Sequence, residues 1–181
     1  MNLKNTDLQF DSAVAACKEI FLQKAKDYGT AWRVLRTISV VDQIFIKALR
    51  IRNIQQIKEQ KISDNISSEL KGIINYAVIG LIQLHLNKPA VEELPIEKVE
   101  GWFDEQIAIA KKIMKDKNHD YGEAWRGMSS ESFVDLILMK LMRIKQILLN
   151  EGKTLISEGI DANYIDIINY AIFALIIADE S

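Results

Sequence analysis

The sequence KDYGTAWR at residues 26–33 returns as HDYGEAWR at residues 119–126, with six of the eight positions identical. Every position of the first copy has its counterpart 93 positions later in the chain. Two stretches this similar within 181 residues indicate an internal repeat, and a repeat governs how the rest of the chain is interpreted. We call the repeated stretch the DYG motif.

The repeat continues beyond the DYG motif. VDQIFIKALRI at residues 41–51 matches VDLILMKLMRI at residues 134–144, again 93 positions apart. IINYA occurs at residues 73–77 and again at residues 167–171, now 94 positions apart. One residue was therefore gained between the second and third matching blocks, and the chain consists of two copies of one unit.

Apolar residues recur at three- and four-residue spacing through both units, which is the pattern of amphipathic helices. No stretch alternates with period two for long enough to predict a strand. We expect Gly29 to end the first helix in a left-handed conformation and Ser39 to cap the second. The six helices are predicted over residues 11–27, 39–60, 66–86 (capped by Ser63, Asp64 or Asn65), 96–117, 130–150 and 159–178.

The middle helix of each unit is apolar on most sides, so a three-helix unit does not bury its own apolar surface. The sequence therefore predicts an all-α helical bundle built from two pseudo-two-fold-related repeats of about three long helices each. The first repeat is expected at residues 1–88 and the second at residues 96–181, joined by a linker at 89–95 that holds both prolines. We expect the two repeats to share one core.

Composition limits the function classes. Lys and Arg total 23 against 25 Asp and Glu, so no overall field attracts nucleic acid or an anionic membrane, and nucleic acid is not an expected partner. The most apolar run, residues 170–178, is shorter than the roughly 20 residues that span a bilayer, and the N-terminus lacks the apolar core of a secretion signal. We therefore expect a cytoplasmic protein without a membrane partner, and a homo-oligomer stays open.

The chain has a single cysteine, Cys17, which excludes an intrachain disulfide framework and a four-cysteine zinc site. Cys17 lies among apolar residues at helical spacing. We expect a buried, unreactive thiol rather than a nucleophile.

Polar residues present in both repeats are the candidate functional residues, because two copies free to diverge lose surface residues first. They form the pairs Asp27/Asp120, Tyr28/Tyr121, Arg33/Arg126, Asp42/Asp135, Lys47/Lys140, Arg50/Arg143, Asn75/Asn169 and Tyr76/Tyr170, with Trp32/Trp125 as an aromatic pair.

Two of these pairs place cations on one helical face. Lys140 and Arg143 are three residues apart, as are Lys47 and Arg50, so each couple projects to the same side of its helix. Two neighbouring cations suit the phosphates of a nucleotide. The alternative is a place at the rim of the bundle, where the stems cover apolar surface and the charges reach water.

The last helix carries an acidic residue, Asp166, in an otherwise apolar segment. A carboxylate there is unfavourable unless it is paired, hydrogen-bonded or bound to a metal ion. Asp166 would either pair with Arg143 or Lys140, or join Asp120 and Asp135 in an oxygen-ligand site for Mg²⁺.

The two repeats differ at this helix. Gly72 aligns with Asp166, and Glu69 aligns with Asn163, so each repeat has one carboxylate at a different turn. The second repeat is the better candidate site because it also has more polar residues around its DYG motif. Trp125 would either stack on a base or act as an apolar plug at the helix end.

These residues resemble a known family. NHDYGEAWR at residues 118–126, followed by VDLILMKLMRI and then DIINYA, is similar to the nucleotide modification associated domain 1 family, here present in tandem over almost the whole chain. The resemblance implies a helical domain linked to nucleotide or modified-base metabolism. It does not supply an agreed set of catalytic residues.

A broader likeness is to the all-α nucleoside triphosphate pyrophosphohydrolases of the MazG type, which bind Mg²⁺ on an ExxE and a following ExxD signature. This chain has Glu97 and Glu100, and Glu158 and Asp161, at those spacings. A whole extra helix separates the two pairs and both lie at helix beginnings, so the signature is not satisfied.

The leading hypothesis is a nucleotide-handling protein, specifically a Mg²⁺-dependent pyrophosphohydrolase of nucleoside triphosphates. Asp120, Asp135 and Asp166 would be the catalytic metal ligands and would orient water. The expected substrate-binding residues are Tyr121, Trp125, Arg126, Lys140, Arg143, Asn169 and Tyr170, and the expected partner is a nucleotide or modified nucleotide.

The alternative hypothesis is a non-catalytic helical interaction or structural module. In that case the repeated polar residues form internal ion pairs that fix the register of the helices. It predicts Asp166 and Asp120 against Arg or Lys, with no open pocket.

Overall fold

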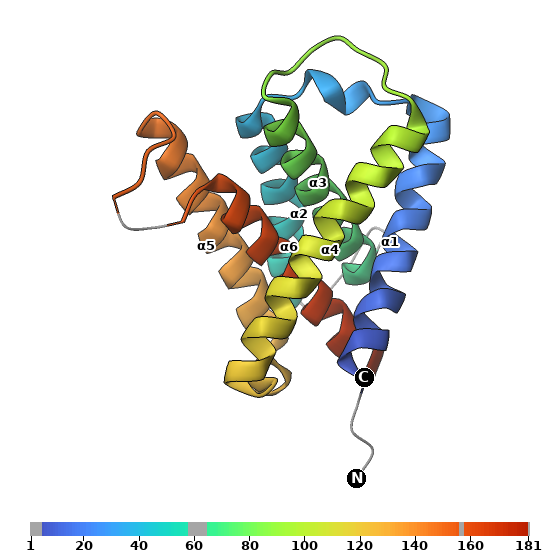
Figure 1. Cartoon of the computed structure of the whole chain (residues 1–181). Helices are drawn as coiled ribbons and strands as arrows, with labels where there is room; N and C mark the ends of the chain where they lie inside the picture. Colours follow the sequence, from blue (N-terminus) through green and yellow to red (C-terminus); the bar gives the residue numbers. More distant parts are fainter. Residues whose placement is uncertain (1–4, 58–64, 156–157, 181) are drawn as a thin grey trace.

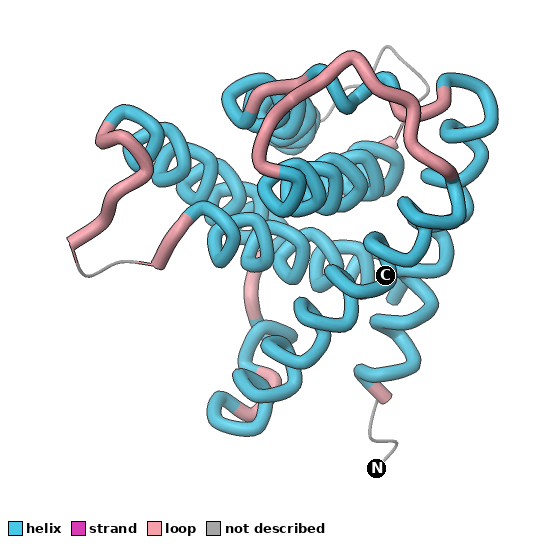
Figure 2. Tube along the Cα trace, turned by 45° about the horizontal axis from the view of Figure 1, so that its top comes forward, coloured by secondary structure: helices cyan, strands magenta, loops and turns pink. Residues whose placement is uncertain are grey.

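The structure is a computed structural model that describes residues 5–57, 65–155 and 158–180. These residues form six α-helices and two short 3₁₀ helices, with no strand among them (Figures 1 and 2). In chain order the helices are α1 (Thr6–Tyr28), η1 (Ala31–Val34), α2 (Thr37–Ile57), α3 (Ile66–Leu86), α4 (Ile96–Tyr121), η2 (Ala124–Gly127), α5 (Ser130–Leu149) and α6 (Ile160–Glu180). The predicted all-α class is confirmed.

The helices of the two repeats pack in matching pairs. The last helices of the repeats, α3 and α6, lie against each other at the centre of the molecule. Helix α2 packs on α3, α5 packs on α6, and α2 also contacts α5. Helices α1 and α4 contact one another and both central helices (Figure 1). Each of these contacts between α-helices has its counterpart in the other repeat, which is the predicted pseudo-two-fold arrangement.

One hydrophobic core includes buried residues of both repeats. The central contact is close at Gly80 of α3, where a Cβ atom would lie 2.6 Å from Cζ of Tyr164 on α6. Helix α6 is long and apolar enough, by length and composition alone, to cross a membrane, but 67% of its most apolar window is buried against other helices. A central position in this core accounts for the apolar character of α6.

Local sequence explains where several helices begin and end. Helix α1 starts earlier than predicted because the side chain of Asn5 accepts a hydrogen bond from the Leu8 amide. Of the three residues predicted to cap α3, Asn65 does so, because its side chain accepts a hydrogen bond from the Ser68 amide. Ser63 and Asp64 lie outside the described residues. The predicted start of α2 is wrong, because the helix begins at Thr37 and Ser39 lies inside it. Its predicted end at residue 60 lies outside the described residues.

Two glycines end the first helix of each repeat, as the DYG motif predicts. Gly29 has φ 59° and Gly122 has φ 62°, values that favour glycine over residues with a Cβ atom. The amide of Gly29 donates to the carbonyl of Ala25, and that of Gly122 to the carbonyl of Asn118. Gly122 is left-handed, whereas Gly29 has ψ −138°, so the left-handed conformation predicted for Gly29 is wrong although the glycine does end the helix.

Reciprocal ion pairs link α1 and α4. Nζ of Lys18 lies 2.9 Å from Asp104 Oδ1, and Nζ of Lys111 lies 2.7 Å from Asp11 Oδ1. Lys18 corresponds to Lys111 and Asp11 to Asp104 at the offset of 93, so the two bonds are copies of one interaction. The repeats therefore face each other as two subunits of a fused dimer would.

Candidate functional site

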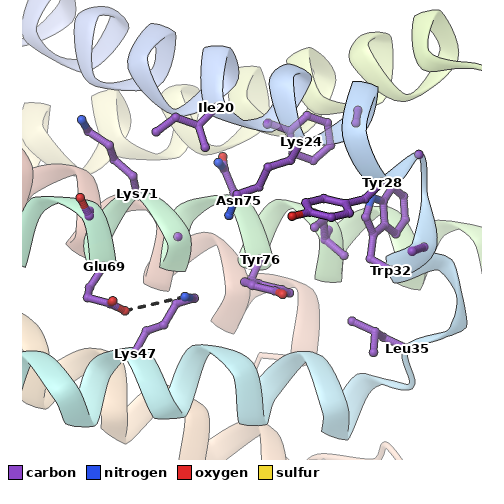
Figure 3. Close-up of a pocket in the computed structure, with 17 residues that line it drawn as sticks. Ile20, Lys24, Tyr28, Trp32, Leu35, Lys47, Glu69, Lys71, Asn75 and Tyr76 are labelled. Atoms are coloured by element: carbon purple, nitrogen blue, oxygen red, sulfur yellow. Dashed lines mark ion pairs between the residues drawn. The ribbon is translucent and has the colours of Figure 1, made fainter. Parts of the chain in front are cut away.

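A cavity of about 590 Å³ lies in the first repeat, between α1, η1, α2 and α3 (Figure 3). Its volume is in the range of sites that hold small ligands, roughly 300–1,000 Å³. The sequence favoured the second repeat, whereas this cavity is lined by the first.

The cavity has an excess of positive charge. Lys24 of α1, Lys47 of α2 and Lys71 of α3 line it together with a single carboxylate, that of Glu69, so three cations face one anion. Glu69 is already engaged, because its Oε1 lies 2.6 Å from Nη1 of Arg50 and its Oε2 lies 3.7 Å from Nζ of Lys47. The lining would therefore favour an anionic ligand.

The side chain of Lys47 packs closely against the helix at Gly72. A Cβ atom at Gly72 would lie 3.0 Å from both Cδ and Cε of Lys47, closer than most such contacts. Lys47 therefore lies directly over the helix at Gly72, and nothing projects from position 72 into the cavity.

Aromatic side chains form another part of the lining. Tyr28 is 70% exposed at the end of α1, and Trp32 of η1 is half-buried. Figure 3 shows these two rings together at one end of the cavity, with Tyr76 between them and Lys47. The Lys47 ammonium lies 5.8 Å from the centroid of the Tyr76 ring. The cavity thus presents flat apolar surfaces beside its cations, a combination that suits a charged molecule with a planar ring.

The corresponding region of the second repeat is occupied by its own side chains. Asp166 replaces Gly72, and its Oδ1 lies 3.0 Å from Nζ of Lys117 while its Oδ2 lies 2.9 Å from Nζ of Lys140. These two lysines are the counterparts of Lys24 and Lys47. Burial lowers the pKa of Lys117, but its hydrogen bond and attraction to Asp166 outweigh burial, so its pKa is raised above the ordinary value.

The aromatic part is filled as well. Phe173 replaces Ile79 and stacks on Trp125, with ring centroids 4.1 Å apart and an interplanar angle of 6°. The Arg126 guanidinium lies 4.4 Å from the centroid of the Trp125 ring. Trp125 is only 6% exposed and acts as the apolar plug that was one of its two predicted roles.

The model of a family described as nucleotide modification associated domain 1 matches residues 24–84 and 117–177 of this chain. The chain belongs to this family. It carries two copies of the domain, each beginning at a lysine of the pair just described, Lys24 or Lys117. No curated protein and no solved structure matches the chain.

The structure does not bring together the three carboxylates predicted to bind Mg²⁺ in the second domain copy. Asp120 is 76% exposed and contacts His119, and Asp135 lies 3.8 Å from Arg52. Asp166 is bound by two lysines, as the ion-pair alternative predicted. Among residues 5–57, 65–155 and 158–180, no group of three His, Cys, Asp or Glu side chains could hold a metal ion.

The repeated residues Asp42 and Asp135 link the two domain copies. Oδ1 of Asp42 lies 3.3 Å from Nζ of Lys145, and Oδ1 of Asp135 lies 3.8 Å from Nη1 of Arg52. Lys145 is the counterpart of Arg52, so these are again two copies of one interaction, here between α2 and α5. Both are partly exposed ion pairs outside the cavity.

The repeated arginines of the DYG motifs hold each motif against its surroundings. Arg33 is buried, donating from Nη1 to Gln83 Oε1 at 2.6 Å and from Nε to Glu92 Oε2 at 3.1 Å. Arg126 has equivalent roles with side chains of α1, α6 and its own motif. Its partners are Thr6, Gln9, Glu123 and Glu180. Both guanidiniums are engaged inside the protein and point to structural roles.

In each repeat the repeated asparagine connects the last helix to the first helix of the same repeat. Nδ2 of Asn75 donates to the Cys17 carbonyl at 3.0 Å, and Nδ2 of Asn169 donates to the Ala110 carbonyl at 3.1 Å. Cys17 is fully buried, and burial raises the pKa of its thiol to about 12, although the nearby Lys71 charge lowers it. The expected buried location of Cys17 is confirmed.

The remaining candidates lie apart from one another. Arg143 lines a shallow depression of about 340 Å³ with Asn150 and Lys153 at the end of α5. Tyr121 is 75% exposed, and Asp27 is exposed at the end of α1. Tyr170 is half-buried against the core.

Two of the three cavity lysines, Lys24 and Lys71, were not among the residues predicted from the sequence. Lys24 and Lys117 are identical at the offset of 93, just before the DYG motif, so extending the repeat by two residues would have found them. Lys71 aligns with Ile165, and no repeat signal marks it.

Proposed function

We propose that this protein binds a nucleotide in the cavity of its first repeat, with the phosphate on the lysines and the base on the aromatic side chains. The observation that carries the proposal is the excess of cations beside flat aromatic surfaces in one cavity of about 590 Å³. Membership of a family described as nucleotide modification associated supports it.

The cations suit phosphate oxygens in particular. Lys24, Lys47 and Lys71 come from three different helices and line the cavity from different sides. Figure 3 shows Lys47 directed toward Glu69 and Lys71 directed toward α1. Lysine acts as a compact point charge with three donors, and partly buried charges are screened less by salt than exposed ones.

The aromatic side chains suit a base. Stacking of a base on an aromatic side chain contributes about 1–3 kcal/mol and is tolerant of base identity. Trp32 and Tyr28 offer two such surfaces at the same end of the cavity (Figure 3). We expect modest discrimination between bases.

The residues of the cavity favour binding over metal-dependent hydrolysis. Mg²⁺ in nucleotide hydrolases is held by one or two carboxylates that remain available to it. The single carboxylate of the cavity, Glu69, is bound to Arg50 and Lys47. The pyrophosphohydrolase hypothesis therefore becomes an outcome of the test and not its premise.

The test is calorimetric titration with nucleoside mono-, di- and triphosphates, alongside release of phosphate and pyrophosphate with Mg²⁺ or Mn²⁺. We expect binding without release, and at least about tenfold weaker binding, or 1.4 kcal/mol, in Lys24→Met and in Lys47→Met. Lys26→Met is the matched control, because Lys26 lies in the same turn of α1 but does not line the cavity. An equal loss in the control, or no binding of any nucleotide, would overturn the proposal, and pyrophosphate release would restore the hydrolase hypothesis.

A further inference from the structure

We infer that the second repeat is a copy of the binding site occupied by its own side chains, and that it shows where the ligand lies in the first. Asp166 takes the place of the ligand's phosphate and Phe173 the place of its base. The inference rests on the proposed function and adds a ligand class, a position for each part and a stoichiometry of one ligand per chain.

The positions correspond residue by residue. Asp166 is the counterpart of Gly72, and Phe173 is the counterpart of Ile79, both at the offset of 94. Gly72 and Ile79 both line the cavity of the first repeat. The two substitutions therefore add a carboxylate and a ring to the second repeat at the two places where the first repeat has a cavity wall.

The carboxylate marks an anion position. Asp166 is 10% exposed and is bound by Lys117 and Lys140 at 3.0 and 2.9 Å. The same two lysines exist in the first repeat as Lys24 and Lys47, with glycine at position 72, and both line the cavity. Nζ of Lys47 lies 3.7 Å from Glu69 Oε2, a longer contact than either lysine makes with Asp166. An anionic group that reaches the ammonium groups of Lys24 and Lys47 would restore the contacts that the second repeat makes internally.

A phosphate fits that position better than a carboxylate would. A phosphate monoester carries about −1.5 to −2 charges near pH 7, more than one carboxylate. The first repeat supplies the additional cation, because Lys71 lines the cavity where the second repeat has Ile165. Glu69, the counterpart of Asn163, also lines the cavity, but its Oε1 lies 2.6 Å from Nη1 of Arg50.

The stacked ring marks the base position. Phe173 lies flat against Trp125, whereas the smaller Ile79 leaves the corresponding space beside Trp32 within the cavity. Positions 166 and 173 are seven residues apart on one helix, which is two turns and about 10 Å along the axis. That separation is comparable to the length of a nucleoside monophosphate from base to phosphate, and we assign the ligand to that class.

The decisive experiment introduces residues of the second repeat at the corresponding positions of the first repeat. Titration of the full chain with the four common nucleoside 5′-monophosphates and with inorganic phosphate should give one site per wild-type chain. Gly72→Asp should weaken binding of every nucleotide and of phosphate at least tenfold, because its carboxylate would take both lysines. Gly72→Asn is the matched control with equal size and no charge, and it should weaken binding less.

A second variant separates the two parts of the ligand. Ile79→Phe fills the base position and should weaken nucleotide binding about tenfold while leaving the binding of inorganic phosphate unchanged. The reverse double variant, Asp166→Gly with Phe173→Ile, should raise the stoichiometry to two if it retains the helical content of the wild type.

The outcomes distinguish the two proposals. Wild-type protein that binds neither nucleotide nor phosphate would overturn both. If Gly72→Asp binds a nucleotide as well as the wild type does, this inference is overturned and the proposed function stands. The same holds if Gly72→Asn weakens binding as much as Gly72→Asp.

Discussion

The two repeats carry the same lysine pair and the same tryptophan but use them differently. In the second repeat Asp166 binds both lysines and Phe173 stacks on Trp125. In the first repeat glycine and isoleucine stand at those places, and a cavity remains. The role of a repeated side chain therefore depends on what faces it from other helices.

Each of the two hypotheses from the sequence fits a different repeat better. The second repeat matches the structural alternative at Asp166, which is bound by two lysines. It differs from that alternative at Asp120, which is exposed and contacts His119. The first repeat has the cavity that this alternative did not predict. Duplication thus allows one copy of the domain to fill this region with its own side chains while the other retains a cavity.

The largest expected effect is a difference in the free energy of unfolding between variants of the two tryptophans. Trp125→Ala removes a buried, stacked ring and should lower the free energy of unfolding by about 3–5 kcal/mol, measured by denaturant titration. Trp32→Ala removes a half-buried ring beside a cavity and should lower it by roughly 1–2 kcal/mol, with the main loss in nucleotide binding. Equal destabilisation by both changes would contradict the difference in packing between the repeats.

The next largest effect on stability is expected at Asp166, the carboxylate bound by two lysines. Asp166→Asn should destabilise the protein by about 2–4 kcal/mol near pH 7, because it leaves two lysines, one of them largely buried, without their counter-charge. The exposed pair of Asp116 and Lys112 gives the matched control, and Asp116→Asn should change stability by less than about 0.5 kcal/mol.

The pH dependence of the same variant has a definite sign. The pKa of Lys117 is raised in the folded protein, so its contribution is complete below the unfolded lysine pKa of about 10.4 and is lost as the pH rises through the folded value. The stability difference between wild type and Asp166→Asn should be constant around neutrality and shrink above about pH 10.5. A difference that grows with alkaline pH would contradict the ion pair.

The smallest effect tests the symmetry itself. Double-mutant cycles on Asp42 with Lys145, and on Asp135 with Arg52, should each give a coupling of about 0.2–1 kcal/mol, because both pairs are partly exposed. The two couplings should be similar, with the shorter Asp42 pair at the upper end. A coupling above about 2 kcal/mol in one pair would show that the two halves of the α2–α5 contact are not equivalent.

Several of these features could be predicted from the sequence. Periodicity gave all six helices to within a few residues, since the apolar face of a helix is a local property of the chain. The offsets of 93 and 94 predicted the tandem repeat, and they identified Asp42 and Asp135, and Asn75 and Asn169, as counterparts in the two repeats. They did not give the function of these pairs, because a repeated polar residue signals a shared environment, whether structural or ligand-binding.

By itself the sequence determined the helices, the duplication and the family, because spacing and motif order along the chain are sufficient for each of them. Only the tertiary structure decided which repeat holds the cavity. The sequence left open whether Asp166 binds a metal ion or pairs with Arg143 or Lys140, and in the structure it is bound by Lys117 of α4 and Lys140 of α5. Whether a carboxylate is available to a ligand depends on charges brought close by folding, and these charges lie far from it along the chain.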